Sequence, residues 1–404
     1  MEVEESLKKY IWPQYLSALN ETKIDKWGVI NRNLSCALAS NIDQHILEKF
    51  QIQSKKWLQK YLASNLGKQS LALFGGMCDL TFSFWRMNNI IPQYGKELAA
   101  LNEIIYTLLE QRISIIASNV EEIVESDFDV ISGLAGIISY CFLNEKVYHD
   151  LNSKIIEIFI SKTNSDTGWA IANKKLDLSY RKRFPNGYIN LSMSHGILGP
   201  LIAMCQAYSR GYAIAGLKEA IQKLLLLYRK LYDEKRRNIP CIVDVLNTNN
   251  NIFFSRNSWS YGTATIFFSL MKASKIVGDH KLYHEYKKIL IENLLVGEKL
   301  NKYECISPML VNGYGGLLCL LKRLQEEDNM ESLANQIKKL EKHLINMYDK
   351  SAIFGFKHYE YRCGENNVWY VEAYELEGLS HGTLGMIVAL QGDKDLIKSH
   401  LLLY

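Results

Sequence analysis

A glycine-rich turn that leads directly into an apolar run recurs six times along this 404-residue chain. The turns begin at Gly75, Gly133, Gly196, Gly262, Gly313 and Gly382, at intervals of 51 to 69 residues. Such a period is too long for one helix and fits a repeating unit of two helices with their loops. In each unit an apolar helix starts at the turn and a charged amphipathic helix follows, so we expect the second to cover the first. Repeats that close on themselves would form a barrel of helices, with the six turns and the chemistry at one end.

The apolar and amphipathic runs predict the positions of the helices. The buried helices are expected at about Gly76–Met87, after Gly136, after Gly199, at Thr263–Val277, and from near Gly315 and near Gly382. The covering helices are expected at Leu98–Ile116, Tyr148–Lys162, Gly216–Lys235, His280–Leu295 and Asn329–Tyr348, with further amphipathic helices in residues 1–70. We expect a long aromatic loop at 350–379 and a small irregular insertion around 163–192. Because no Pro/Gly/Ser-rich linker interrupts the pattern, a single domain over residues 1–404 is predicted.

Charge and cysteine usage exclude several classes of protein. A formal net charge of +4 is too small to indicate a nucleic-acid-binding protein. The polar N-terminus MEVEESLKKY is not a signal peptide, and no apolar run is long enough for a transmembrane segment. Eight scattered cysteines without a CxxC motif are typical of free core thiols in a reducing cytoplasm.

Polar side chains that could take part in catalysis or binding lie in or just before the turns. They are Asp129, His195, Arg256, Trp259, Ser260, Tyr261, Asn312, Glu377, Ser380 and His381. Taken singly, an Asp, Ser or Asn here is a helix N-cap, and a lone His or Arg is a structural residue. If the turns converge, however, an acid, a histidine and an arginine from different units meet in one pocket, which is the usual mark of a site.

Five of these turns, taken in order, resemble the lanthionine synthetase C family, the LanC-type cyclases of lantibiotic biosynthesis. The matching segments are FDVISGLAGIISY, NLSMSHGILGP, RNSWSYG, SPMLVNGYGGL and LEGLSHGTLG. The resemblance covers nearly the whole chain. It implies an α/α toroid, with seven inner helices inside seven outer ones.

The resemblance also implies a reaction, the Michael-type addition of a peptide cysteine thiol to dehydroalanine or dehydrobutyrine, which makes a lanthionine or methyllanthionine ring. A thiol with a pKa of about 8.5 is mostly protonated at neutral pH, and only the thiolate attacks well. By resemblance His195 is the acid/base, Asp129 orients it, Arg256 stabilises negative charge and Tyr261 belongs to the same catalytic group. Trp259, Ser260, Asn312 and His381 are expected to line the substrate pocket.

The implied partners follow from this reaction. They are a dehydrated lanthipeptide precursor with its leader, a dehydratase and an ABC transporter. We expect a cytoplasmic protein, or one held peripherally at the membrane in a biosynthetic complex.

This chain departs from the family at the zinc site. Two cysteines and a histidine hold the metal in the family, and here those positions are Ser260, Val311 and Asn312. None of the three is a zinc ligand, so we expect no zinc and no other cofactor in the protein. A different combination, His381 with His195 and Cys363, has no spacing that indicates a metal site.

Two functions remain open at this point, and a third is weaker. The chain is either a zinc-independent cyclase that relies on His195 to form the thiolate, or a non-catalytic LanC-like protein that binds the modified precursor or scaffolds the dehydratase and transporter. The third class is a glycoside hydrolase, because other α/α toroids use paired carboxylates. Glu372, Glu375 and Glu377 would serve there, but they read better as a solvated loop face.

Overall fold

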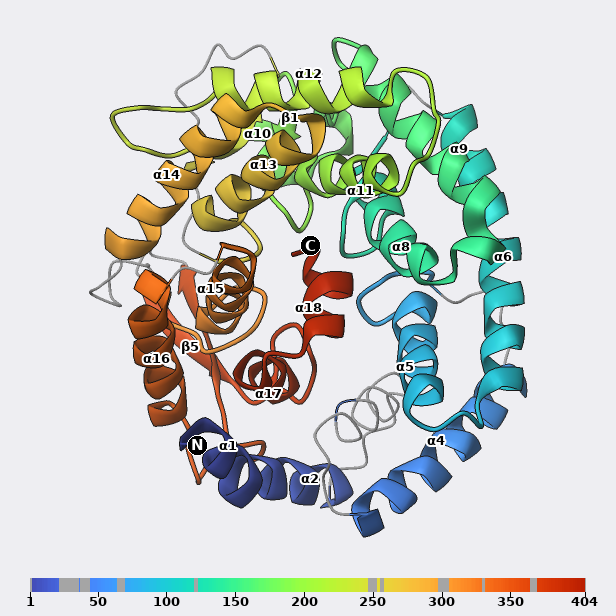
Figure 1. Ribbon diagram of the computed structural model, residues 1–404, viewed down its shortest axis with the longest axis vertical. Coiled ribbons are helices and arrows are strands. Elements are labelled where there is room, and N and C mark those ends of the chain that lie inside the picture. Colours follow the sequence, from blue (N-terminus) through green and yellow to red (C-terminus); the bar gives the residue numbers. More distant parts are fainter. Residues whose placement is uncertain are drawn as a thin grey trace. The chain divides into compact units, whose positions relative to one another are not determined.

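The computed structural model describes residues 2–21, 36, 44–63, 70–119, 123–245, 253–254, 258–296, 305–328, 331–363 and 369–403. Helices dominate this part of the chain (Figure 1). It divides into two compact units, a terminal one and a central one. The terminal unit is built mainly from Met1–Lys68, Phe82–Gly95 and Leu295–Leu403. The central unit is built mainly from Gln69–Thr81 and Lys96–Leu294.

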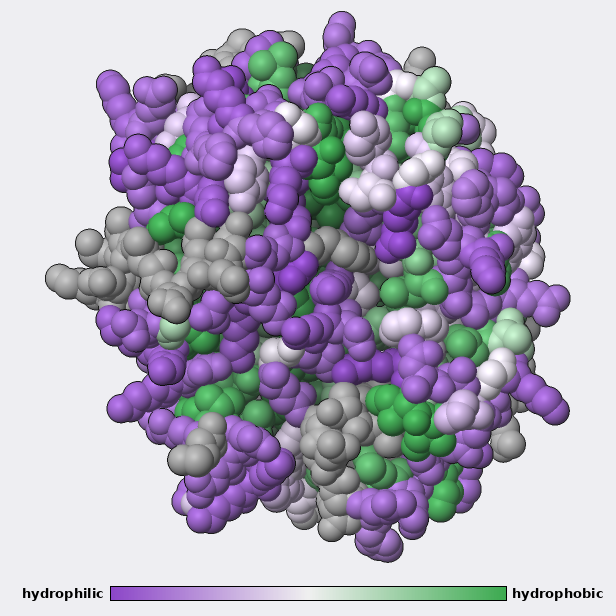
Figure 2. Space-filling model, viewed as in Figure 1, coloured by the Kyte–Doolittle hydropathy of each residue, from purple (hydrophilic) through white to green (hydrophobic). Residues whose placement is uncertain are grey.

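The central unit follows the predicted pattern of apolar helices covered by amphipathic ones. Its longer helices are α6 (Gly95–Ser118), α8 (Leu134–Cys141), α9 (Glu145–Asn164), α11 (Leu198–Ser209), α12 (Leu217–Lys230), α13 (Thr263–Val277) and α14 (His280–Val296). Every residue of α8 is buried, whereas α12 buries only one stripe at helical spacing. Helix α11 packs against α8 and α13, and α9 and α12 lie outside them (Figure 1). The polar faces of α12 and α14 form a largely hydrophilic surface in Figure 2.

The terminal unit repeats this arrangement. It contains α1 (Glu2–Ser6), a π-helical turn (Leu7–Ile11), α2 (Trp12–Glu21), α4 (Gln44–Ala63), α15 (Tyr314–Asp328), α16 (Glu331–Asn346), α17 (Thr383–Gln391) and α18 (Lys394–Leu401). Helix α5 (Met77–Ile90) contributes residues to both units. Helix α15 packs against α16 and α17, and α17 is buried over most of its length. Arg86 of α5 and Asp393, the N-cap of α18, form a buried ion pair with 2.5 Å between Nη2 and Oδ2. In the described ranges no helix combines the length and hydropathy needed to cross a lipid bilayer.

A close approach of the backbone explains why glycine recurs at the turns. A Cβ atom on Gly262 would lie 1.7 Å from the carbonyl oxygen of Ser258, and one on Gly133 would lie 2.2 Å from the amide nitrogen of Asp129. Both distances are far inside van der Waals contact, so only glycine fits. Similar clashes with nearby backbone occur at Gly76, Gly196, Gly313 and Gly382. Each turn therefore folds back on the residues just before it, and this places their side chains at the start of the buried helix.

Most predicted helices form with small differences at their ends. Helix α13 has the predicted bounds, Thr263–Val277. Helices α8 and α11 begin slightly earlier than predicted, because Gly136 and Gly199 lie inside the first helical turn rather than before it. The insertion expected around 163–192 contains a 3-10 turn (Asn173–Lys175), α10 (Leu178–Arg183) and a short strand.

The strands are the main structural feature that the sequence pattern did not predict. In the central unit β1 (Tyr188–Asn190), β2 (Pro240–Asp244) and β3 (Phe253–Phe254) form an antiparallel sheet in that order, with Ile189 opposite Val243. In the terminal unit β4 (His358–Cys363) and β5 (Trp369–Tyr374) form a hairpin in which His358 pairs with Tyr374. The prediction of a loop over 350–379 is therefore wrong for this hairpin. Its segments HYEYRC and WYVEAY are rich in the aromatic residues that favour strands.

The cysteines lie in the core, as the scattered spacing predicts. Among the described residues seven are buried and form no disulfide: Cys36, Cys78, Cys141, Cys205, Cys241, Cys305 and Cys319. Burial raises the pKa of the Cys319 thiol to about 12, and it raises the pKa values of Cys78, Cys141 and Cys205 as well. The side chain of Cys363 lies outside the described part of the chain.

Candidate active site at the second and third glycine turns

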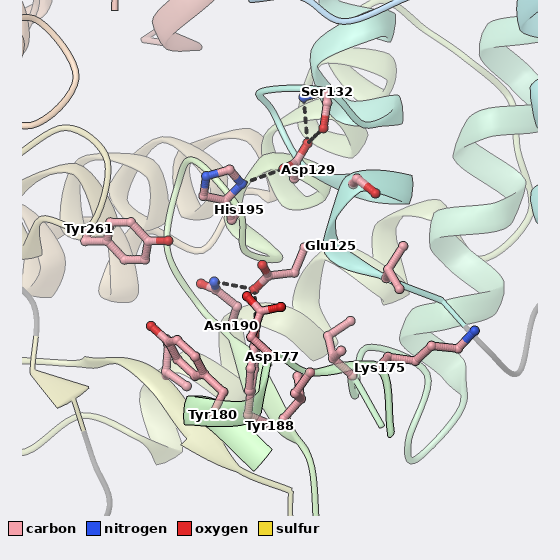
Figure 3. A pocket seen from close by; sticks show the side chains of 15 residues that line it. Glu125, Asp129, Ser132, Lys175, Asp177, Tyr180, Tyr188, Asn190, His195 and Tyr261 are labelled. Atoms are coloured by element: carbon pink, nitrogen blue, oxygen red, sulfur yellow. Dashed lines mark hydrogen bonds and ion pairs between the residues drawn. The ribbon is translucent and has the colours of Figure 1, made fainter. Parts of the chain in front are cut away.

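The second and third turns bring an aspartate and a histidine together. The Nδ1 atom of His195 lies 2.6 Å from Oδ2 of Asp129 (Figure 3). Asp129 follows the short helix α7 (Glu125–Phe128), and His195 lies in the turn before α11. The backbone amide of Val130 donates to the carbonyl of Ser194 at 3.1 Å and joins the two turns directly. Residues 66 apart in the sequence thus form one pair.

The Asp129 carboxylate is fixed by the turn that follows it. Its Oδ1 accepts hydrogen bonds from the backbone amides of Ser132 at 2.8 Å and Gly133 at 2.7 Å. The side chain is only 1% exposed, and its second oxygen faces His195. One carboxylate therefore holds the turn before α8 and also orients the imidazole.

His195 has a perturbed acidity. Burial alone would lower the pKa of its imidazole, but the hydrogen bond to Asp129 and the charges of Asp129 and Glu125 outweigh burial and raise that pKa above its ordinary value of 6.5. The side chain remains 38% exposed. With Nδ1 engaged by the carboxylate, Nε2 is the nitrogen available to a substrate. The pair can therefore accept and return a proton near neutral pH.

A cavity of about 370 Å³ opens beside this pair. Its walls combine carboxylates with tyrosines (Figure 3), and the lining includes Glu125, Asp129, Asp177, Tyr180, Tyr188, Asn190, His195 and Tyr261. The Tyr261 ring lies 6.3 Å from the His195 ring, and burial raises the pKa of its phenol. A neutral hydroxyl therefore faces the cavity near the imidazole.

Glu125 is a cavity residue that sequence reasoning missed. Its Oε1 accepts hydrogen bonds from the Tyr188 hydroxyl at 2.9 Å and from Nδ2 of Asn190 at 2.6 Å. Burial raises the pKa of this carboxyl, although both hydrogen bonds and the His195 charge act in the opposite direction. Both partners come from strand β1, which was not predicted. Without that strand nothing in the sequence distinguishes Glu125 from the other acidic residues near it in the chain.

Trp259 and Ser260, which were predicted near the fourth turn, do not line this cavity. Trp259 is fully buried, and its ring packs against that of Phe74 at 6.0 Å. Ser260 is also buried, and its hydroxyl donates to the hydroxyl of Ser194 at 2.6 Å. Arg256 lies outside the described residues.

The remaining predicted pocket residues belong to the terminal unit. The side-chain amide of Asn312 lies with Nδ2 3.1 Å from Nε2 of His381, so the fifth and sixth turns meet here. The amide nitrogen of Val311 donates to the carbonyl of Ser380 at 3.1 Å and joins the same two turns.

The residues at the family's zinc positions do not fit the metal. The Ser260 hydroxyl donates a hydrogen bond to the Ser194 hydroxyl. Val311 has an apolar side chain that is 4% exposed, and Asn312 has a neutral amide. Zinc in proteins takes thiolate, imidazole or carboxylate ligands, and none of these is present. Metal chemistry at these three positions therefore lacks its ligands.

Comparison with known proteins agrees with the geometry of the turns. The sequence model described as "Lanthionine synthetase C-like protein" matches residues 44–392. The curated relative "Nisin biosynthesis protein NisC" from Lactococcus lactis subsp. lactis is 26% identical over 315 residues, which cover 74% of each chain. The solved structure of "Nisin cyclase" matches with a TM-score of 0.79 at 19% identity, over 99% of this chain and 98% of that one. The match confirms the predicted all-α fold class of the α/α toroids. The chain therefore belongs to the lanthionine synthetase C-like family.

Proposed function

We propose that this chain is a lanthipeptide cyclase, which closes lanthionine and methyllanthionine rings by adding peptide cysteine thiols to dehydroalanine and dehydrobutyrine. The observation that carries the proposal is the His195–Asp129 pair beside the tyrosine- and carboxylate-lined cavity. Membership of the family and the match to nisin cyclase support the same reaction class.

In the proposed step, His195 first acts as a base. Nε2 takes the S–H proton of the substrate thiol, and Asp129 stabilises the resulting imidazolium. The thiolate forms the S–C bond at the β-carbon of the dehydroamino acid, and the electron pair of the C=C bond moves toward the carbonyl as an enolate. His195 then returns the proton to the α-carbon. The product has the mass of the substrate, and the enzyme ends in its starting state.

We propose that no metal at Ser260, Val311 or Asn312 takes part in this step. Thiolate formation then depends on the raised pKa of His195 and on positive charge that Arg256 supplies, as the family resemblance implies. Tyr261 is proposed to hydrogen-bond the substrate from the opposite wall of the cavity. Ring closure consumes the product of a dehydration reaction, so we further propose that the chain acts beside a dehydratase. We also propose that it acts in the cytoplasm, with an ABC transporter as a further partner.

Thiol protection tests the function directly. The purified chain is incubated with a peptide that carries a leader, dehydroalanine or dehydrobutyrine residues, and free cysteines. Cyclisation leaves the mass unchanged, so remaining thiols are alkylated and counted by mass spectrometry. We expect thiols to disappear only when protein is present. The control is the same peptide with its serines and threonines not dehydrated, which has no electrophile and must keep its thiols.

The second candidate is a non-catalytic LanC-like protein that binds the modified precursor or scaffolds the dehydratase and transporter. It is favoured by the loss of all three ligands at the family's zinc positions. Peptide binding with thiols that remain fully alkylatable over many hours would support this function and contradict the cyclase.

The pH dependence of ring closure should report on Asp129. If His195 acts first as a base, the rate rises with pH through the raised pKa of its imidazole. Asp129→Asn removes the hydrogen bond and charge that raise this pKa and leaves burial, which lowers it. We therefore expect the acidic limb of the profile to move to lower pH while the maximal rate falls by about 10²-fold. The matched control is Asp177→Asn, which changes an exposed carboxylate of the same cavity and should leave the limb in place. A limb that stays unmoved in Asp129→Asn would exclude His195 as the titrating base.

A further inference from the structure

Three potential metal ligands meet in the terminal unit, outside the cavity described above. They are His358 and Glu360 of strand β4 and His381 of the sixth turn, and their ligand atoms all lie within 4.8 Å of one another. Nε2 of His358 is 2.9 Å from Oε1 of Glu360, and the rings of His358 and His381 are 5.1 Å apart. The trio combines two imidazoles and one carboxylate.

The strand geometry explains why two of these residues face the same way. Residues two apart on a β-strand lie on the same face, so His358 and Glu360 both project from one side of β4. Pairing of His358 with Tyr374 across the hairpin fixes the register of that face. The sixth turn, which contains His381, follows β5 directly along the chain.

Neighbouring groups hold two of the ligands in position. The Ser307 hydroxyl lies 2.8 Å from Nδ1 of His358, which turns Nε2 of this buried ring toward Glu360. Nη2 of Arg362 lies 2.7 Å from the second oxygen of Glu360, which leaves Oε1 to face the histidines. Such partners on the far side of each ligand are the usual support of a metal centre. Arg362 adds positive charge beside the trio, but Glu372 lies 3.5 Å from its Nε and offsets it.

We propose that His358, Glu360 and His381 form a binding site for a divalent transition metal, with zinc as the best match. Two histidines and one carboxylate with an open fourth position form a known ligand set of zinc. Ligands in a tetrahedral zinc site are about 3.4 Å apart, so the trio needs only small side-chain shifts. Glu360 and His381 are partly exposed, which gives an ion a route in and leaves the fourth position open to water or a thiolate.

One neighbour must yield for the ion to bind. Asn312 contacts Nε2 of His381, but its side chain is exposed and free to rotate. The site does not use Ser260, Val311 or Cys363, and it is independent of the proposed ring closure. The sequence prediction of a metal-free protein considered the family's positions and the combination of His381, His195 and Cys363. It missed this trio because two of its members lie in a segment that was expected to be a loop.

Metal titration of the full chain tests the site. The protein is dialysed against a chelator and titrated with Zn²⁺ by calorimetry, and with Co²⁺ by visible absorption, whose intensity reports a four-coordinate site. We expect one ion per chain, and Mg²⁺ should not compete because it prefers all-oxygen ligands. His381→Ala and Glu360→Gln should each weaken binding by at least about 10²-fold, since each removes a direct ligand where even supporting groups cost 10–100-fold.

The matched control is His280→Ala, which removes an exposed histidine at the start of α14 and should bind as the unmodified chain does. Circular dichroism checks that each variant is folded. No Zn²⁺ or Co²⁺ binding by the unmodified chain, or binding by both ligand variants as tight as that of the unmodified chain, would overturn the proposal. The titration uses no peptide, so either result leaves the test of ring closure unaffected.

Discussion

Ring closure is expected to fall by about 10²- to 10⁴-fold when His195 is replaced by alanine. The variant loses the group that accepts the thiol proton and returns it to the α-carbon, while the rest of the cavity stays in place. The side chain is 38% exposed, and Asp129 keeps the backbone hydrogen bonds from Ser132 and Gly133, so the fold should survive. The measurement is the rate of thiol protection at fixed pH, with the unfolding temperature as a check on the fold.

Two further measurements make this result specific. His280→Ala, an exposed histidine of the same unit, should close rings at the unmodified rate. Peptide affinity of His195→Ala should change little, because the lost interaction belongs to the reaction rather than to peptide binding. Full activity of a folded His195→Ala protein would exclude the imidazole as the base and leave the cavity carboxyls as candidates.

The largest effect on stability is expected from Asp393→Ala, which should lower the free energy of unfolding by about 3–5 kcal/mol. Its side chain is 4% exposed and lies 2.5 Å from the guanidinium of Arg86, which is 6% exposed. Removal of Asp393 leaves the buried Arg86 charge with a more distant and largely exposed carboxylate, that of Asp395. The substitution also deletes the N-cap of α18, because Oδ1 of Asp393 accepts from the amide of Leu396. Denaturation by urea, read from the shift of its midpoint, measures the loss.

Two variants separate these contributions. Asp393→Asn keeps a side-chain acceptor for the cap but loses the charge, so it should fall between the unmodified chain and Asp393→Ala. Glu4→Ala breaks the exposed pair with Lys8 and should leave the midpoint of urea denaturation nearly unchanged. Asp395 lies 3.8 Å from Nε of Arg86, but its side chain is 57% exposed. Its carboxylate should therefore stabilise the Arg86 charge too weakly to restore the stability of Asp393→Ala. A midpoint in Asp393→Ala that matches Glu4→Ala would show that this pair is not a main support of the terminal unit.

The buried helices were predictable because two signals agree at each of them. Apolar periodicity separates buried from covering helices, and the glycine turns mark where the buried ones start. Helix α13 has both signals, and its bounds match the prediction. The strands lacked such agreement, since β1 has only three residues and β3 two. Short segments of this kind depend on partners distant in the chain, which local sequence does not reveal.

In the candidate site, the residues of the glycine turns were predictable, and those held in place by strands were not. Asp129 and His195 lie in turns that the repeat pattern brings together, and their contact follows from it. Glu125, in contrast, enters the cavity through hydrogen bonds to strand β1, and His358 meets Glu360 through strand β4. Trp259 matches the family motif in the segment RNSWSYG, but its side chain lies in the core and packs against Phe74. Motif position therefore identifies a turn, whereas the neighbouring strands determine which side chains reach the solvent-accessible space.

The buried cysteines have a consequence for chemoselectivity. Dehydroalanine is an electrophile that alkylates any accessible thiolate, so a protein that holds it for many turnovers risks modifying itself. The seven described cysteines are buried, and their raised pKa values, where resolved, keep the sulfur protonated. A thiol that is both shielded and neutral does not compete with the cysteine of the peptide. At these seven positions the packing of the core therefore suppresses self-alkylation, and in the proposed reaction the incoming peptide supplies the nucleophile.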